Sequence, residues 1–155
     1  MSGTGATALT ALAAVGSGTV GGVFFAFDSF VLRGLGRLPD GLGADAMRSI
    51  NVTAVRPAFM TALFGTAALA VGVVVLGARS SETVERVLLV GGGGAYLVGT
   101  VLTTIMRNLP LNDALEARRG ATWTQFLAAW SRANRVRTAG SLAASAAFTV
   151  ALARP

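Results

Sequence analysis

Most side chains that can do chemistry in this 155-residue chain lie in one segment, residues 107–137. This segment contains both tryptophans, Trp123 and Trp130, and three of the four asparagines, whereas the rest of the chain is mostly Ala, Gly, Val and Leu. The chain has no His and no Cys, which excludes disulfides and thiolate metal sites and removes the usual near-neutral base. An active site in this chain therefore draws on amides, guanidinium groups, indoles and a few carboxylates.

Four of these side chains fall on one line when the segment is projected as a helix at about 100° per residue. Trp123, Trp130, Asn134 and Arg137 share this line. Tryptophans at a membrane interface, with an arginine reaching toward the headgroups, are a structural explanation for such a pattern. A binding site explains better why an amide and a guanidinium group follow the indoles in register, and the pattern alone leaves both explanations open.

An acidic residue, Asp28, lies inside the first apolar run of the chain. A carboxylate within a membrane is costly and is therefore a functional hypothesis by default. Its expected partners are Arg56, Arg107 or Arg137, and a purely structural ion pair is the alternative. Further polar residues are expected at the same end of the helices, where Pro110 predicts a break in the helical backbone. They are Asn51, Arg56, Asn108, Asn112 and Asp113.

The apolar runs that must position these residues predict a single all-α domain over residues 1–155, an integral membrane four-helix bundle. About 20 apolar residues suffice to cross a bilayer, and the expected spans are 6–32, 58–78, 84–106 and 136–153. The first basic residue, Arg33, follows the first run, which favours a retained helix over a signal peptide. Short helices are expected in the two long loops, 33–57 and 107–135, one of them starting at a Thr122–Gln125 capping box.

The arginines predict the orientation of this bundle. Ten of the thirteen lie in or next to the two long loops and three at the other ends of the helices. Basic loops face the cytoplasm, so both loops are expected to be cytoplasmic and both termini outside, in the cell membrane. The net charge of +6 is accordingly assigned to the lipid bilayer rather than to nucleic acid.

Small residues recur at four-residue spacing on three of the predicted spans. In lipid such stripes allow close approach of helix backbones. They favour packing within the chain, although the run Gly91–Gly94 would also leave room for a flat ligand, and a homo-oligomer is left open. The stripes are Ala14, Gly18, Gly22 and Ala26; Gly91, Ala95, Gly99 and Thr103; and Ala139, Ala143, Ala147 and Ala151.

Three stretches together resemble the anthrone oxygenase-like family (DUF1772), with the resemblance covering about residues 21–143. They are G-V-F-F-A-F-D-S-F-V, N-L-P-L-N-D-A-L and W-x-x-F-x-x-x-W-x-x-x-N-x-x-R. The resemblance implies a small four-span membrane protein and, from characterised members, oxidation of polyketide anthrones to anthraquinones by O₂ without metal or flavin. Phe126 stands where many members have Tyr, so no phenol hydroxyl is assigned there.

The resemblance also implies roles for the polar residues. Trp123 and Trp130 are expected to wall a slot for a planar aromatic substrate. Asn112, Asn134 and Arg137 are expected to donate to its oxygens and to be catalytic together with Asp113. The base is left open between Asp113 and Asp28, and Asn51, Arg56 and Asn108 are expected as further substrate contacts. The alternative is a non-catalytic membrane protein that binds a quinone, a lipid or a partner subunit in the same cleft.

Overall fold

A computed structural model describes residues 3–154, and the part of the chain that it describes is helical, without strands. Five continuous rods follow one another. The first joins α1 (Thr4–Ala26), the π-helical turn η1 (Phe27–Val31) and α2 (Leu32–Leu35). The second is α3 (Asp40–Ala54). The third joins α4 (Pro57–Met60), η2 (Thr61–Gly65) and α5 (Thr66–Arg79). The fourth joins α6 (Thr83–Gly94), η3 (Ala95–Leu102), η4 (Thr104–Asn108) and α7 (Leu109–Glu116), and the fifth is α8 (Trp123–Leu152).

Local sequence signals account for most helix starts. Pro57 occupies the beginning of α4, where its missing N–H costs nothing. The capping box at Thr122 is confirmed, since its hydroxyl accepts from the Gln125 N–H while the Gln125 side chain accepts from the Thr122 N–H. Glu82 caps α6, because its carboxylate accepts from the backbone N–H of Glu85.

The prediction of a break at Pro110 is wrong, because the helical rod continues from Thr83 to Glu116. Proline lacks an N–H and its ring crowds the carbonyl one turn earlier. Directly before α7 the chain forms the π turn η4, which is wider than an α turn. We attribute the continuity of this rod to that wider turn, which relieves the clash without ending the helix.

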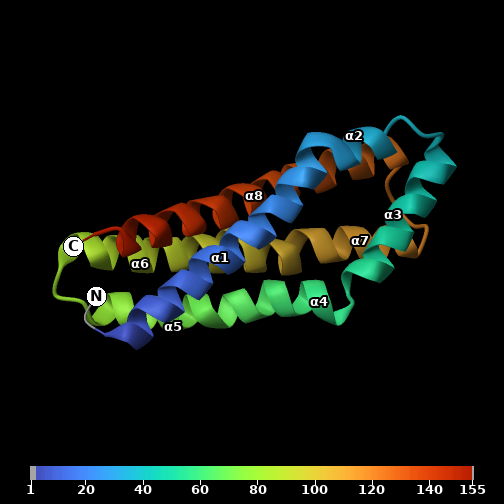
Figure 1. Ribbon diagram of the computed structural model, residues 1–155. Coiled ribbons are helices and arrows are strands. Elements are labelled where there is room, and N and C mark those ends of the chain that lie inside the picture. Colours follow the sequence, from blue (N-terminus) through green and yellow to red (C-terminus); the bar gives the residue numbers. More distant parts are fainter. Residues whose placement is uncertain (1–2, 155) are drawn as a thin grey trace.

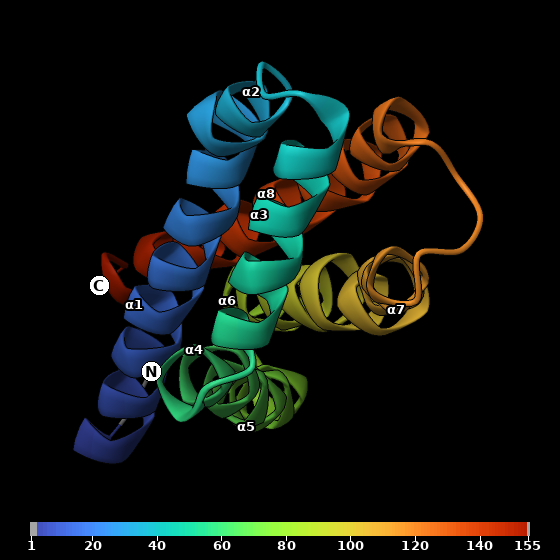
Figure 2. The ribbon, with the colours of Figure 1, turned by 90° about the vertical axis from the view of Figure 1, so that its right-hand side faces the viewer.

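Four long rods run lengthwise, and α3 crosses one end of the bundle (Figure 1). The view along the bundle shows α3 spanning from α2 toward α4, in front of α8 (Figure 2). The described chain begins and ends at the opposite end of the bundle. The fold thus has one end formed by the termini and the α5–α6 turn, and another covered by α3.

Three of the rods are long and apolar enough to cross a membrane among the described residues: Thr4–Leu35, Pro57–Arg79 and Thr83–Glu116. The all-helical membrane fold expected from the sequence is thereby confirmed. The fourth span stays a prediction. Its predicted residues form the second half of α8, a single 30-residue helix whose first half carries three arginines. The boundaries of the spans and the orientation of the termini also stay predictions.

Two clusters of buried apolar side chains hold the rods together. The larger one lies between α1, α5, α6 and the second half of α8 and includes Val20, Tyr96 and Phe148. The smaller one fixes α3 onto α2 and the start of α8 and includes Met47 and Trp123. This smaller cluster fixes α3 across the end of the bundle opposite the termini.

Candidate functional site

A cavity of about 470 Å³ lies under α3, between α1, α4, α7 and α8. This size is within the range of small-molecule sites, roughly 300–1,000 Å³. Its wall is mostly apolar, with a small number of polar groups. The apolar lining comprises Val23, Phe24, Phe27, Met47, Ile50, Ala54, Val55, Phe59, Met60, Leu63, Leu109 and Trp130, and the polar lining comprises Ser49, Asn51, Thr53, Thr104, Asn112 and Arg137.

Arg137 is the charged residue in the cavity wall among the described residues. It is only 5% exposed and lies between two rings, with its guanidinium carbon 4.1 Å from the centroid of Phe24 and 4.8 Å from that of Trp130. Both distances are within the range of cation–π attraction. The rings hold the guanidinium plane while leaving its N–H groups available for hydrogen bonding.

Asn134 fixes this guanidinium from one turn earlier on α8. Its side-chain oxygen accepts from Nη2 of Arg137 at 2.7 Å, and its Nδ2 donates to the carbonyl of Phe24 at 2.8 Å. Arg137 Nε is buried and has no hydrogen-bond partner among the described residues. One amide therefore joins α8 to α1 and orients a cation that keeps an unused donor.

The Phe24 carbonyl that Asn134 reaches lies just before the π turn η1. π turns inside α-helices leave backbone groups without their usual partners and occur often at functional sites. Three of the rods contain such turns, and residues of η1, η2 and η4 line the cavity through Phe27, Leu63 and Thr104.

A second amide, Asn112, is held by the indole of Trp130. Trp130 Nε1 donates to Asn112 Oδ1 at 2.8 Å, which joins α8 to α7. The bond occupies the amide oxygen and leaves the Nδ2 group as a donor for a ligand. On α3, Asn51 presents a buried Nδ2 that has no partner within the described chain. The cavity therefore has amide donors on two sides and a guanidinium group on a third.

Asp28 lies on the opposite side of α8 from this cavity. Its Oδ2 accepts from the Thr138 hydroxyl at 2.7 Å, while its Oδ1 is buried without a partner among the described residues. Its charge acts on Arg137, one of the three arginines expected beside it. The two residues do not form one of the ion pairs that join described side chains. The carboxylate of Asp28 thus balances the charge of Arg137 from outside the cavity, and Asp28 lines a different groove.

The structure brings only some of the residues expected at the site to the cavity. Asn51, Asn112, Trp130 and Arg137 line it, and Asn134 supports Arg137. The other five expected residues lie elsewhere.

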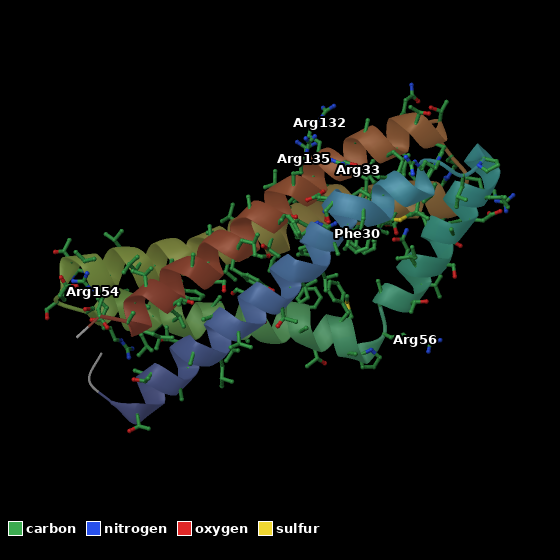
Figure 3. All side chains as sticks on the ribbon, turned by 45° about the horizontal axis from the view of Figure 1, so that its top comes forward. Phe30, Arg33, Arg56, Arg132, Arg135 and Arg154 are labelled. Carbon is green, nitrogen blue, oxygen red and sulfur yellow. The ribbon has the colours of Figure 1, made fainter. Side chains whose placement is uncertain are left out.

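Asp113 is exposed on α7, and Arg56 is exposed where α3 meets α4, pointing away from the bundle (Figure 3). Trp123 stacks on Phe126 beneath α3, with ring centroids 5.6 Å apart. Asn108 is 1% exposed and has both amide atoms unpartnered among the described residues, but it does not line the cavity. Asp28 lies in the groove described above.

The phenylalanines of the cavity wall were not among the residues expected at the site from the sequence. Phe24 and Phe27 are three residues apart on one helical face, beside Asp28, and Phe59 follows Pro57. The helical spacing of Phe24 and Phe27 is the sequence signal that could have identified this wall. Met47, Ile50 and Ala54 of α3 also line the cavity.

The fold and the cavity define a helical membrane protein with a ligand-sized apolar site near one end of the bundle. The family model for anthrone oxygenase matches residues 53–147. The chain belongs to this family, and membership supports an oxygenase-like function for a membrane protein. Comparison with curated proteins and with solved structures gave no match.

Proposed function

We propose that the protein is a cofactor-independent membrane monooxygenase that oxidises a planar aromatic polyketide of the anthrone type to a quinone. The observation that supports this most is the setting of Arg137, a buried cation with an unused donor in the wall of a mostly apolar cavity. A flat aromatic molecule that becomes an oxyanion during reaction matches this combination of apolar wall and fixed donors.

The reaction converts a ring methylene to a carbonyl. One O₂ and two C–H hydrogens give one new C=O and one H₂O, so the substrate itself supplies the electrons. Loss of a proton from the methylene gives an electron-rich enolate, which reduces O₂. The carbon hydroperoxide that forms then loses water. An enzyme for this sequence must stabilise the enolate oxygen and exclude bulk water.

The chain offers residues for each of these tasks. Arg137, oriented by Asn134, donates to the enolate oxygen, and its charge favours the deprotonated form. Asn112 and Asn51 donate to the remaining oxygens of the substrate. Phe24, together with α3 above the cavity, shields the reacting carbon from bulk water.

The proton acceptor in this proposal is water rather than a side chain. Asp113 is exposed outside the cavity, and Asp28 lines the groove on the other side of α8. A guanidinium group beside the oxygen stabilises the product anion, as a fixed oxyanion donor does, and so makes the methylene C–H more acidic. Asp28 then acts as a positioning residue through Thr138 and the charge of Arg137.

The alternative function is non-catalytic binding of a quinone or related molecule in the same cavity. The cavity's apolar wall with amide and guanidinium donors suits a quinone carbonyl as well as an enolate. Turnover separates the two functions.

The test is oxygen uptake by purified, chelator-treated protein in detergent with a hydroxylated anthrone, corrected for autoxidation. We expect uptake proportional to protein, with one quinone formed per O₂ consumed. Arg137→Gln should lower the rate by about 10²–10³, the usual effect of losing one oxyanion donor. Arg132→Gln, an exposed change on the same helix, should leave it unchanged in equally folded protein. Saturable binding of the anthrone without uptake would overturn the oxygenase proposal in favour of binding alone.

A further inference from the structure

A second hollow lies on the other side of α8 and is not used by the proposed function. It is a groove of about 670 Å³ between the η1–α2 segment and the first half of α8. Two arginines line it, Arg33 from α2 and Arg135 from α8. In Figure 3 both extend from the outer face of the bundle, near Phe30.

These arginines are available for an external anion. Both are exposed, and neither forms an ion pair with a described carboxylate. The carboxylate in the same groove, Asp28, already accepts from Thr138, and its other oxygen is buried. The negative charge is therefore at the inner wall and the positive charges are at the outer rim, so an anion binds at the rim.

The position of the rim indicates where such an anion comes from. Arg33 lies in the last turn of the apolar rod Thr4–Leu35, where a membrane-spanning helix reaches the headgroup layer. The groove wall on the membrane side of Arg33 includes the apolar side chain of Phe25, which is 57% exposed. Leu127 from α8 lies on the other side of Arg33, next to Gly36. A neighbouring hollow of about the same volume shares Arg33 and Leu127 and continues past Phe30, which is 65% exposed, to Arg37.

We propose that this groove holds one anionic glycerophospholipid of the surrounding bilayer. Its phosphate lies between Arg33 and Arg135, and one acyl chain runs past Phe25 toward the interior of the bilayer. Arginine recognises phosphate through paired N–H donors, and polybasic rims attract anionic lipids. The lipid fills the space between the η1–α2 segment and α8, and so steadies the two elements that carry Asp28 and Thr138.

The test compares lipid binding to detergent-purified protein by native mass spectrometry, with phosphatidylglycerol and phosphatidylcholine as probes. We expect one phosphatidylglycerol to bind with high preference. Arg33→Gln combined with Arg135→Gln should weaken this binding roughly 30-fold, as expected for the loss of two interfacial arginines. The matched control, Arg107→Gln with Arg119→Gln, removes the same charge from exposed positions that do not line the groove.

Three outcomes would overturn the proposal. Equal weakening in both double variants would mean that net charge, not the groove, attracts the lipid. Equal binding of phosphatidylglycerol and phosphatidylcholine would mean that the groove does not select an anionic lipid. Displacement of the lipid by millimolar inorganic phosphate would assign the rim to a soluble phosphate. Circular dichroism of each variant checks that the helices are intact, which exposed substitutions should leave unchanged.

Discussion

Where glycines line the helix contacts, the rods touch backbone to backbone, whereas under α3 the same rods separate around a cavity of about 470 Å³. We call the first the glycine-packed region, formed by Gly77, Gly93, Gly99 and Gly140. A Cβ at Gly140 would lie 2.7 Å from the Ala95 carbonyl oxygen and 2.9 Å from Gly99 Cα. In lipid, such contacts replace the missing hydrophobic drive between helices.

The cavity region has the opposite chemistry. Two buried polar atoms of its lining residues, Arg137 Nε and Asn51 Nδ2, have no partner among the described residues. Buried polar groups without partners cost stability. We therefore infer that the glycine contacts contribute most to stability and that the cavity region serves ligand recognition.

The largest expected effect comes from breaking the glycine-packed region. Gly140→Val places a branched side chain against the Ala95 carbonyl, which cannot move without shifting η3. We expect a loss of about 3 kcal/mol or more in the free energy of unfolding, at the upper end of overpacking costs. Gly91→Val is the matched control, because a Cβ there meets nothing within 4 Å. Unfolding in mixed detergent measures both, and similar values for the two variants would contradict the packing account.

A smaller effect distinguishes two buried asparagines at the end of the bundle that contains the cavity. Asn134→Leu removes the amide hydrogen bonds to the Phe24 carbonyl and to the buried Arg137 guanidinium, and we expect it to cost about 2–3 kcal/mol. Asn108→Leu removes an amide with no partner among the described residues, so we expect the stability to stay equal or rise by about 1 kcal/mol. Chemical unfolding of the two variants gives the comparison. A large loss of stability on Asn108→Leu would show that its amide makes a structural interaction and would contradict this account.

The sequence predicted the helical architecture because apolar run length and cap chemistry are local signals. The Thr122–Gln125 box starts a helix as expected. The helical projection also placed Trp130, Asn134 and Arg137 on one buried face of α8. Local rules failed at Pro110, where a π turn, invisible to α-helical periodicity, carries the rod onward.

The content of the cavity was harder to predict because it depends on which way each rod turns. Asp113 and Asn112 are neighbours in sequence, yet only Asn112 lines the cavity. Asp28 and Phe27 likewise face opposite sides of α8, one toward the groove and one toward the cavity. Polar character alone selects residues of both kinds, and tertiary packing decides between them.

The measurement that tests the account most directly is tryptophan fluorescence with a planar quinone, the product of the proposed reaction. The chain has two tryptophans, and only Trp130 lines the cavity. In Trp123→Phe, the remaining Trp130 should be quenched saturably as an anthraquinone binds. In Trp130→Phe, the remaining Trp123 should keep its emission at ligand concentrations that fill the site, with occupancy followed by equilibrium dialysis. Bound quinone that quenches Trp123 and leaves Trp130 unchanged would contradict the placement of the site under α3.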